Sequence, residues 1–207
     1  MFAMAALANA SLIPVLSSEL PSGSNFAFNY TANVTADERL DPTATNGVTC
    51  PGAGNTLVQC NPAGTFFTIY DIPGFISAFT TASGWTVSEQ NTGATPSTIN
   101  GSSFDSPALT NVTFAYTGSV VAGPATVTGF QIVSSDSGQN TSGHFTSQST
   151  NNLGSSAGTS AQLSSSVAVP GSSAGVPGDP APEPRSLVMI GLGVMAVLLG
   201  GARRRKV

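Results

Sequence analysis

Apolar and polar residues alternate over short stretches of this chain, and no sustained 3.6-residue helical period appears before residue 186. The clearest alternation has apolar residues at every second position: Phe26, Phe28, Tyr30, Ala32 and Val34. Other short runs, rich in aromatic and β-branched residues, lie at 65–70, 85–87, 112–116, 129–133 and 143–146. Turn pairs such as Pro73-Gly74 and Ser83-Gly84 separate them. This pattern predicts a mainly β domain over residues 11–150, a β-sandwich with a jelly roll or partial barrel as alternatives.

The composition favours an exported protein. Only 8% of the residues are charged, against about 25% in an ordinary soluble domain. Serine and threonine take their place, with 28 and 23 copies, beside 23 glycines and 14 prolines. We therefore expect a turn-rich domain outside the cytoplasm.

The few charges are divided between two parts of the chain. Residues 11–184 contain ten carboxylates and one cation, Arg39, whereas the residues after them contain five cations and no acid. An acidic body with one arginine cannot neutralise a run of phosphates, so nucleic-acid binding is excluded. No motif in the chain calls for a cofactor.

The first ten residues resemble the end of a signal peptide. They are apolar and small, and Ala8-Asn9-Ala10 has the A-x-A form that signal peptidase cleaves after. The basic segment that normally begins such a peptide is missing, so we expect residues 1–10 to be a remnant whose start lies upstream. The alternative is a buried N-terminal strand or helix turn.

Residues 151–180 have the composition of a linker. They hold no aromatic residue and one charge, Asp179, among serine, glycine, alanine and proline. Such a segment is not expected to form a packed core. We predict a flexible tether there.

The C-terminus predicts one short transmembrane helix. Ser186–Ala202 is uncharged over 17 residues, about 25 Å as a helix and just long enough to cross a bilayer. The cations Arg203, Arg204, Arg205 and Lys206 follow it, and they are expected to stay on the cytoplasmic side. A buried core helix is the alternative, but a wholly apolar stretch ended by four cations does not suit one.

The order of Pro182-Glu183-Pro184, a short apolar helix and an arginine cluster resembles the PEP-CTERM sorting signal of Gram-negative bacteria. The resemblance covers residues 181–207. It implies recognition by an exosortase, a membrane peptidase that removes the tail. It also implies an inner-membrane anchored intermediate, then a cell-surface or extracellular fate, commonly alongside exopolysaccharide. The same tail ends many unrelated proteins, some labelled ice-binding, so it implies no activity for the body.

Cys50 and Cys60 are the only cysteines, ten residues apart in a loop rich in proline, glycine and asparagine. In an exported protein such a pair is expected to form a structural disulfide. A zinc site would need four ligands, and the chain has one histidine.

The candidates for chemistry are few. His144, beside Phe145, suits a half-exposed strand position better than a catalytic base. Asp37, Glu38 and Asp41 suit a solvated turn better than a Ca²⁺ site. The other carboxylates are scattered and form no recognisable catalytic pair. We therefore predict no catalytic residue and no metal ligand.

Aromatic residues give the remaining alternative. Trp85, Tyr70 and Tyr116 would suit a carbohydrate-binding surface if they were exposed, but a single tryptophan in a β domain is more often in the core. We accordingly expect a non-enzymatic surface or extracellular-matrix protein processed by exosortase. A carbohydrate-binding module for cell-surface polysaccharide is the alternative, and a glycoside hydrolase comes third.

Overall fold

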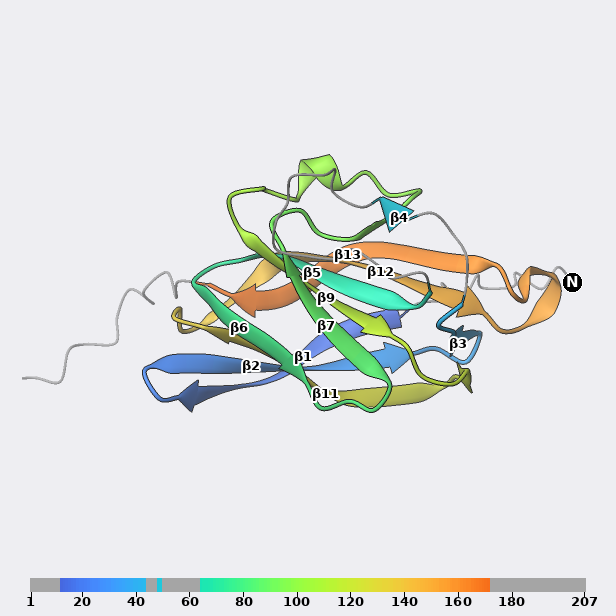
Figure 1. Cartoon of the computed structure of the whole chain (residues 1–207), viewed down its shortest axis with the longest axis horizontal. Helices are drawn as coiled ribbons and strands as arrows, with labels where there is room; N and C mark the ends of the chain where they lie inside the picture. The colour runs from blue at the N-terminus through green and yellow to red at the C-terminus, as the bar shows by residue number, and fades with distance from the viewer. Residues whose placement is uncertain (1–11, 44–47, 50–63, 172–207) are drawn as a thin grey trace, which may run out of the picture. The chain divides into compact units, whose positions relative to one another are not determined.

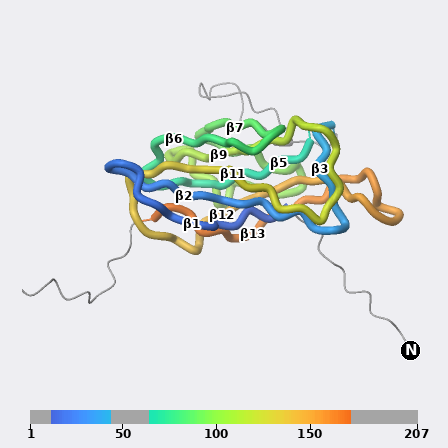
Figure 2. Tube along the Cα trace, turned by 90° about the horizontal axis from the view of Figure 1, so that it is seen from below, coloured from blue at the N-terminus to red at the C-terminus, as the bar shows by residue number. Residues whose placement is uncertain are grey.

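The computed structural model describes residues 12–43, 48–49 and 64–171, which form antiparallel sheets consistent with a β-sandwich (Figure 1). The prediction of a mainly β domain is confirmed. A four-stranded sheet has the order β1, β2, β11 and β6. These strands are β1 (Leu12–Ser22), β2 (Asn25–Val34), β11 (Ala125–Ser134) and β6 (Phe75–Thr80). Figure 2 shows them side by side in this order.

A seven-stranded sheet forms the other layer. Its path runs β10, β3, β12, β5, β9 and β7, and β13 pairs with the free side of β12. The strands are β10 (Val121–Ala122), β3 (Glu38–Leu40), β12 (Gln139–Asn151), β5 (Phe66–Ile72), β9 (Thr110–Tyr116), β7 (Trp85–Gln90) and β13 (Ser160–Pro170). A small third sheet joins β4 (Val48–Thr49) to β8 (Thr95–Pro96). Two single 3-10 turns, η1 (Gly101–Ser103) and η2 (Gly154–Ser156), complete the described elements.

The predicted linker is wrong in its first two thirds. Residues 160–170 form β13, which pairs with β12 along its length, and η2 lies in the connection between the two strands. The physical reason is that apolar residues recur at alternate positions within this serine-rich sequence, which is the pattern of a β-strand. Ala161, Leu163, Val167 and Val169 alternate with polar or small residues, and Leu163, Val167 and Val169 contact the core. The part of the predicted tether beyond residue 171 lies outside the described residues.

Two strands on the four-stranded sheet were also not predicted. β1 holds two prolines and mixed polarity, and β6 follows directly on the turn at Pro73-Gly74. That turn was predicted correctly: Gly74 has φ +58°, the left-handed conformation that glycine adopts after proline in a type II turn. A Cβ atom at this position would lie 2.5 Å from Ser135 Oγ, so the turn requires glycine.

The core lies between the sheets and is centred on aromatic rings. Phe130 of β11 inserts among Phe67, Phe114 and Trp85 of the opposite sheet. Its ring centroid lies 5.0–5.1 Å from each of theirs, at interplanar angles of 66–85°. Edge-to-face contacts of this kind stabilise by about 0.5–1.5 kcal/mol each beyond the burial of apolar area.

Three side-chain to backbone hydrogen bonds connect strands of the four-stranded sheet with β13, with β7 and with the turn before β12. Tyr30 of β2 donates its hydroxyl to the carbonyl of Ala168 in β13, at 3.0 Å. Glu89 of β7 accepts from the amide of Ala78 in β6, at 3.1 Å, and Glu19 of β1 accepts from that of Gly138, at 2.8 Å. Each bond pairs a backbone N–H or C=O group that would otherwise need another hydrogen-bond partner.

Both ends that the sequence singled out lie outside the described residues, namely the signal-peptide remnant 1–10 and the sorting segment 181–207. Within the described part of the chain, no helix is long and apolar enough to cross a membrane.

Replacing Phe130 with alanine is expected to lower the free energy of unfolding by about 3–5 kcal/mol, because the cavity would open against three rings. Phe79→Ala is the matched control: Phe79 lies on the neighbouring strand β6 and is 44% exposed, so its loss is expected to cost less than about 1 kcal/mol. Denaturant unfolding followed by Trp85 fluorescence measures both. Equal losses would contradict the central position of Phe130.

Candidate functional site

The outer face of the seven-stranded sheet is polar but largely covered. Residues 91–109, the cover segment, connect β7 to β9 and lie on this face. Thr68 of β5 bonds to Thr113 Oγ1 and donates to the carbonyl of Ala94, each at 2.8 Å. The Tyr70 hydroxyl bonds to Ala94, Thr95 and Thr146 at 2.7–2.9 Å. Burial raises the pKa of Tyr70 to about 12, so the phenol stays neutral.

Two carboxylates, Asp71 and Asp105, accept hydrogen bonds from the backbone of the cover segment. Asp105 accepts from the amide of Gly93 and from Asn111 Nδ2, both at 2.9 Å. Asp71, which has φ +52°, accepts from the amide of Ser106 at 2.9 Å. Burial raises the pKa of Asp105, with a further contribution from the charge of Asp71. The two carboxylates thus serve to hold the backbone of the cover segment.

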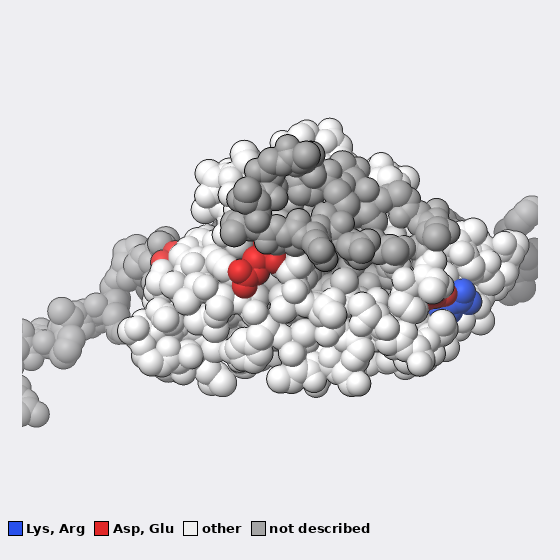
Figure 3. Space-filling view, viewed as in Figure 1, with Lys and Arg blue, Asp and Glu red and all other residues white. Residues whose placement is uncertain are grey.

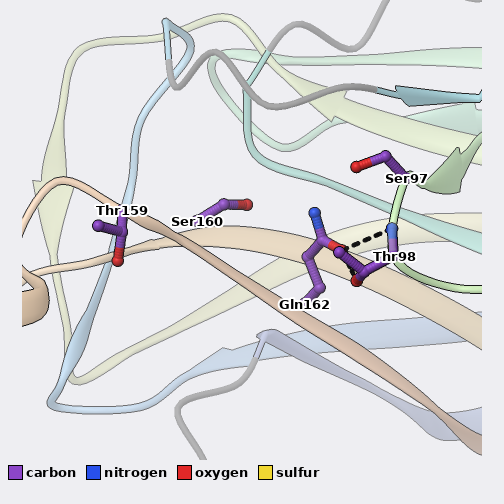
Figure 4. A pocket seen from close by; sticks show the side chains of 5 residues that line it. All are labelled: Ser97, Thr98, Thr159, Ser160 and Gln162. Atoms are coloured by element: carbon purple, nitrogen blue, oxygen red, sulfur yellow. Dashed lines mark hydrogen bonds between the residues drawn. The ribbon is translucent and has the colours of Figure 1, made fainter.

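A groove of about 410 Å³ lies between the cover segment and the start of β13. It is lined by Ser97, Thr98, Thr159, Ser160 and Gln162 and is called the Gln162 groove below. Figure 4 shows Gln162 reaching from β13 toward Thr98, with Thr159 and Ser160 on the other side of the groove. Every one of these lining side chains carries a hydroxyl or amide, and none of them is ionisable.

A chain of amides holds Gln162 in place. Its Oε1 accepts from the Thr98 amide at 3.3 Å and from the Thr98 hydroxyl. Its Nε2 donates to Gln148 Oε1 at 3.0 Å, and Gln148, which is fully buried, donates to the carbonyl of Gly64 at 3.1 Å. The groove therefore presents fixed neutral donors and acceptors, which suit hydroxyl groups of a neutral ligand.

His144 is a half-buried residue of β12, as the sequence predicts. Its Nε2 lies 2.8 Å from Ser164 Oγ, and its ring stacks on Phe104 with centroids 4.0 Å apart. Burial lowers the pKa of His144. Its described partners are therefore a serine hydroxyl of β13 and a phenyl ring of the cover segment.

The expected solvated turn at Asp37, Glu38 and Asp41 is wrong for two of the three residues. Glu38 is 0% exposed and Asp41 is 5% exposed. Asp41 forms a salt bridge with Arg39 at 2.9 Å and accepts from the amide of Thr43. Burial alone would raise the pKa of Asp41, but its bonds from Thr43 and Arg39 lower it. In the described ranges, no three His, Cys, Asp or Glu side chains gather into a metal-binding cluster.

Glu38 is an isolated buried acid. Its Oε2 accepts a hydrogen bond from Ser149, and its Oε1 has no partner within the described structure. Burial raises the pKa of Glu38 from 4.5 to about 7, and the nearby charge of Asp37 adds to the shift. Glu38 therefore favours the neutral acid form in the folded protein.

The aromatic residues considered for sugar stacking are not available at the surface. Trp85 and Tyr116 are 7% exposed and Tyr70 is 1% exposed. The prediction of a core tryptophan is confirmed, and the three residues cannot form a binding surface. Figure 3 shows one side of the molecule, on which most of the described surface carries no charge.

The remaining predicted site residues lie outside the described residues. They are the A-x-A alanines, the two cysteines, the sorting motif and the terminal cations: Ala8, Ala10, Cys50, Cys60, Pro182, Glu183, Pro184, Arg203, Arg204, Arg205 and Lys206. Their predicted roles stay predictions.

No local sequence pattern predicts the Gln162 groove. Thr98 and Gln162 are 64 residues apart and meet because β13 returns alongside β12, beneath the cover segment. The alternation at 161–169 was the available signal for β13, but no local signal places Thr98 against it.

Comparisons with protein-family models, with curated proteins and with solved structures found no match to this chain.

Glu38→Gln is expected to remove a pH dependence of stability. Because the pKa of Glu38 is raised in the folded state, its contribution is fully present below pH 4.5 and is lost as the pH rises through about 7. The loss is on the order of 3 kcal/mol. Chemical denaturation of both proteins across this range measures it.

The difference between the two stability curves isolates the contribution of Glu38. The other acids and the histidine with shifted pKa values, Asp41, Asp105 and His144, are present in both proteins. The wild type is expected to lose stability relative to Glu38→Gln as the pH rises. Parallel curves would contradict a buried, neutral Glu38.

Proposed function

We propose that this chain is a non-enzymatic exported protein of the cell surface or extracellular matrix, processed by an exosortase. The observation that supports the proposal is the order of the C-terminal features: Pro182-Glu183-Pro184, 17 uncharged residues and four consecutive cations. That order resembles the PEP-CTERM signal, whose recognition implies removal of the apolar tail outside the cytoplasm.

The composition of the folded part agrees with this proposal. Charged residues are scarce, and several carboxylates bond to backbone amides, as Glu19, Glu89 and Asp105 do. Asp105 does not support a catalytic pair of carboxylates, because both of its oxygens accept hydrogen bonds, one from the Gly93 amide and the other from Asn111. We assign the sandwich a binding or structural role.

Changing Pro182, Glu183 and Pro184 to alanine is expected to keep the full-length protein in the inner membrane of an exosortase-bearing host. The wild type is expected to appear at the surface or in the medium with its tail removed. Cell fractionation with intact-mass measurement of the recovered chain distinguishes the two results.

The matched control changes Pro177, Asp179 and Pro180 to alanine, which removes two prolines and one acid just upstream of the motif. This variant is expected to be processed normally. Normal release of the variant lacking the Pro-Glu-Pro motif would overturn the proposal.

A second candidate function is non-catalytic binding of neutral polysaccharide. The Gln162 groove favours it, because its surface is concave, its hydroxyl and amide groups are oriented, and none of the described residues that line it is ionisable, which suits sugar hydroxyls. The excess of carboxylates over residues 11–184 disfavours a polyanionic ligand.

The folded domain is expected to bind a neutral polysaccharide, such as a β-glucan or galactomannan, and not alginate. Because no ion pairs would be involved, binding is expected to persist at about 0.5 M salt, where electrostatic interactions are screened beyond a few ångströms. Affinity electrophoresis in gels containing each polymer measures this. Preferential binding to alginate that salt abolishes would contradict this second function.

A further inference from the structure

The outer face of the four-stranded sheet carries a row of uncharged side chains, two of which are amides. In the register of the sheet, Ser18, Asn29, Gln131 and Phe79 stand opposite one another across β1, β2, β11 and β6. Gln131 Nε2 donates to Asn29 Oδ1 at 2.6 Å, and Asn29 Nδ2 donates to Ser18 Oγ at 3.0 Å. With strands about 4.8 Å apart, the row is about 14 Å long.

The neighbouring rows are uncharged as well. On one side Val15, Thr31 and Thr128 are in register, and on the other side Leu20, Ala27, Val133 and Ser77. The acid in β1, Glu19, pairs with the core residue Phe28 and bonds to the Gly138 amide. The three rows therefore contain no ionisable side chain.

An aromatic ring, that of Phe79, lies at one end of the row that contains Asn29 and Gln131. Phe79 is 44% exposed, and Ile76 of the same strand is 52% exposed. Leu20 and Val15, which are 54% and 43% exposed, lie on β1 at the opposite edge of the sheet. By contrast, Phe130 and Ile132 point from the neighbouring strand into the core and are 0% exposed. Phe79 thus faces away from the core on the same side as Gln131, because residues paired across antiparallel strands share a face.

We propose that this face, the Gln131 face, is the main docking surface for a neutral polysaccharide chain. The proposal rests on the second candidate function above and adds the surface where the polymer binds. Phe79 stacks on a sugar ring, and the amides of Asn29 and Gln131 bond to hydroxyl groups along the row.

Charge selects this occupant among the alternatives. A basic protein would find no carboxylate in these rows to pair with, and a polyanion would be repelled by the acidic body. A neutral polymer rich in hydroxyl groups requires both an apolar ring and planar donors and acceptors, and the face supplies both. Among the described residues that line the Gln162 groove, by contrast, there is no aromatic ring.

The test compares affinity for a soluble β-glucan and a galactomannan among five proteins. Phe79→Ala is expected to weaken binding by about tenfold or more, since truncating an aromatic anchor typically costs more than 1 kcal/mol. Phe79→Trp, which keeps a ring, is expected to retain the wild-type affinity.

Gln162→Ala probes the groove. Leu153→Ala removes an equally exposed apolar side chain, 56% exposed and away from the Gln131 face. Both are expected to change affinity by less than about twofold.

The outcomes separate the two proposals. If the wild type binds and Phe79→Ala binds equally well, the Gln131 face is overturned while carbohydrate binding stands. If Gln162→Ala alone loses binding, the groove is the main site instead. If the wild type binds no neutral polysaccharide, both proposals fail. Sedimentation checks the remaining occupant: a wild-type dimer that Phe79→Ala dissociates, with no change in glycan affinity, would assign the face to a second copy of the chain.

Discussion

The contact of Phe130 with the rings of Phe67, Phe114 and Trp85 is the interaction on which the sandwich depends. It joins β11, an inner strand of one sheet, to three successive strands of the other sheet, β5, β9 and β7, which are distant from β11 in sequence. Once these rings are in contact, alternation places the remaining side chains of each strand either in the core or on an outer face. The hydrogen bonds of Tyr30, Glu89 and Glu19 then connect sheets that are already in position.

The small number of charges has a clear structural use. Arg39 pairs with Asp41, while Glu19, Glu89, Asp71 and Asp105 each accept from a backbone amide. Glu38 is buried with a single described hydrogen-bond partner, Ser149. Most of the acids therefore act within the fold, and the surfaces considered for binding present amides, hydroxyls and apolar groups. The two proposed surfaces differ mainly in shape, since one is a groove and the other a sheet face with a ring at its edge.

The sequence predicted strands wherever apolar residues contrasted strongly with their neighbours, as in β2, whose Phe28, Tyr30 and Ala32 are all buried. The sequence did not predict β13, because serine occupies many positions of this strand. The serine-rich composition indicated a linker more strongly than the weak alternation of apolar residues indicated a strand. Glu38 and Asp41 were misjudged because a carboxylate's burial depends on distant residues: Ser149 contacts Glu38 from 111 positions away. The Gln131 face required the cross-strand register, which joins residues 18, 29, 79 and 131 and leaves no trace in local sequence.

The position of β13 at the end of the folded domain has a consequence for synthesis and export. β13 pairs with β12 over ten residue pairs and supplies Val167 and Val169 to the core, so the sandwich is incomplete until residue 170 has been delivered. A chain that emerges with its N-terminus first therefore cannot complete the domain until 170 of its 207 residues have emerged. Until then, the side of β12 that β13 covers in the finished fold is open to pairing with another strand.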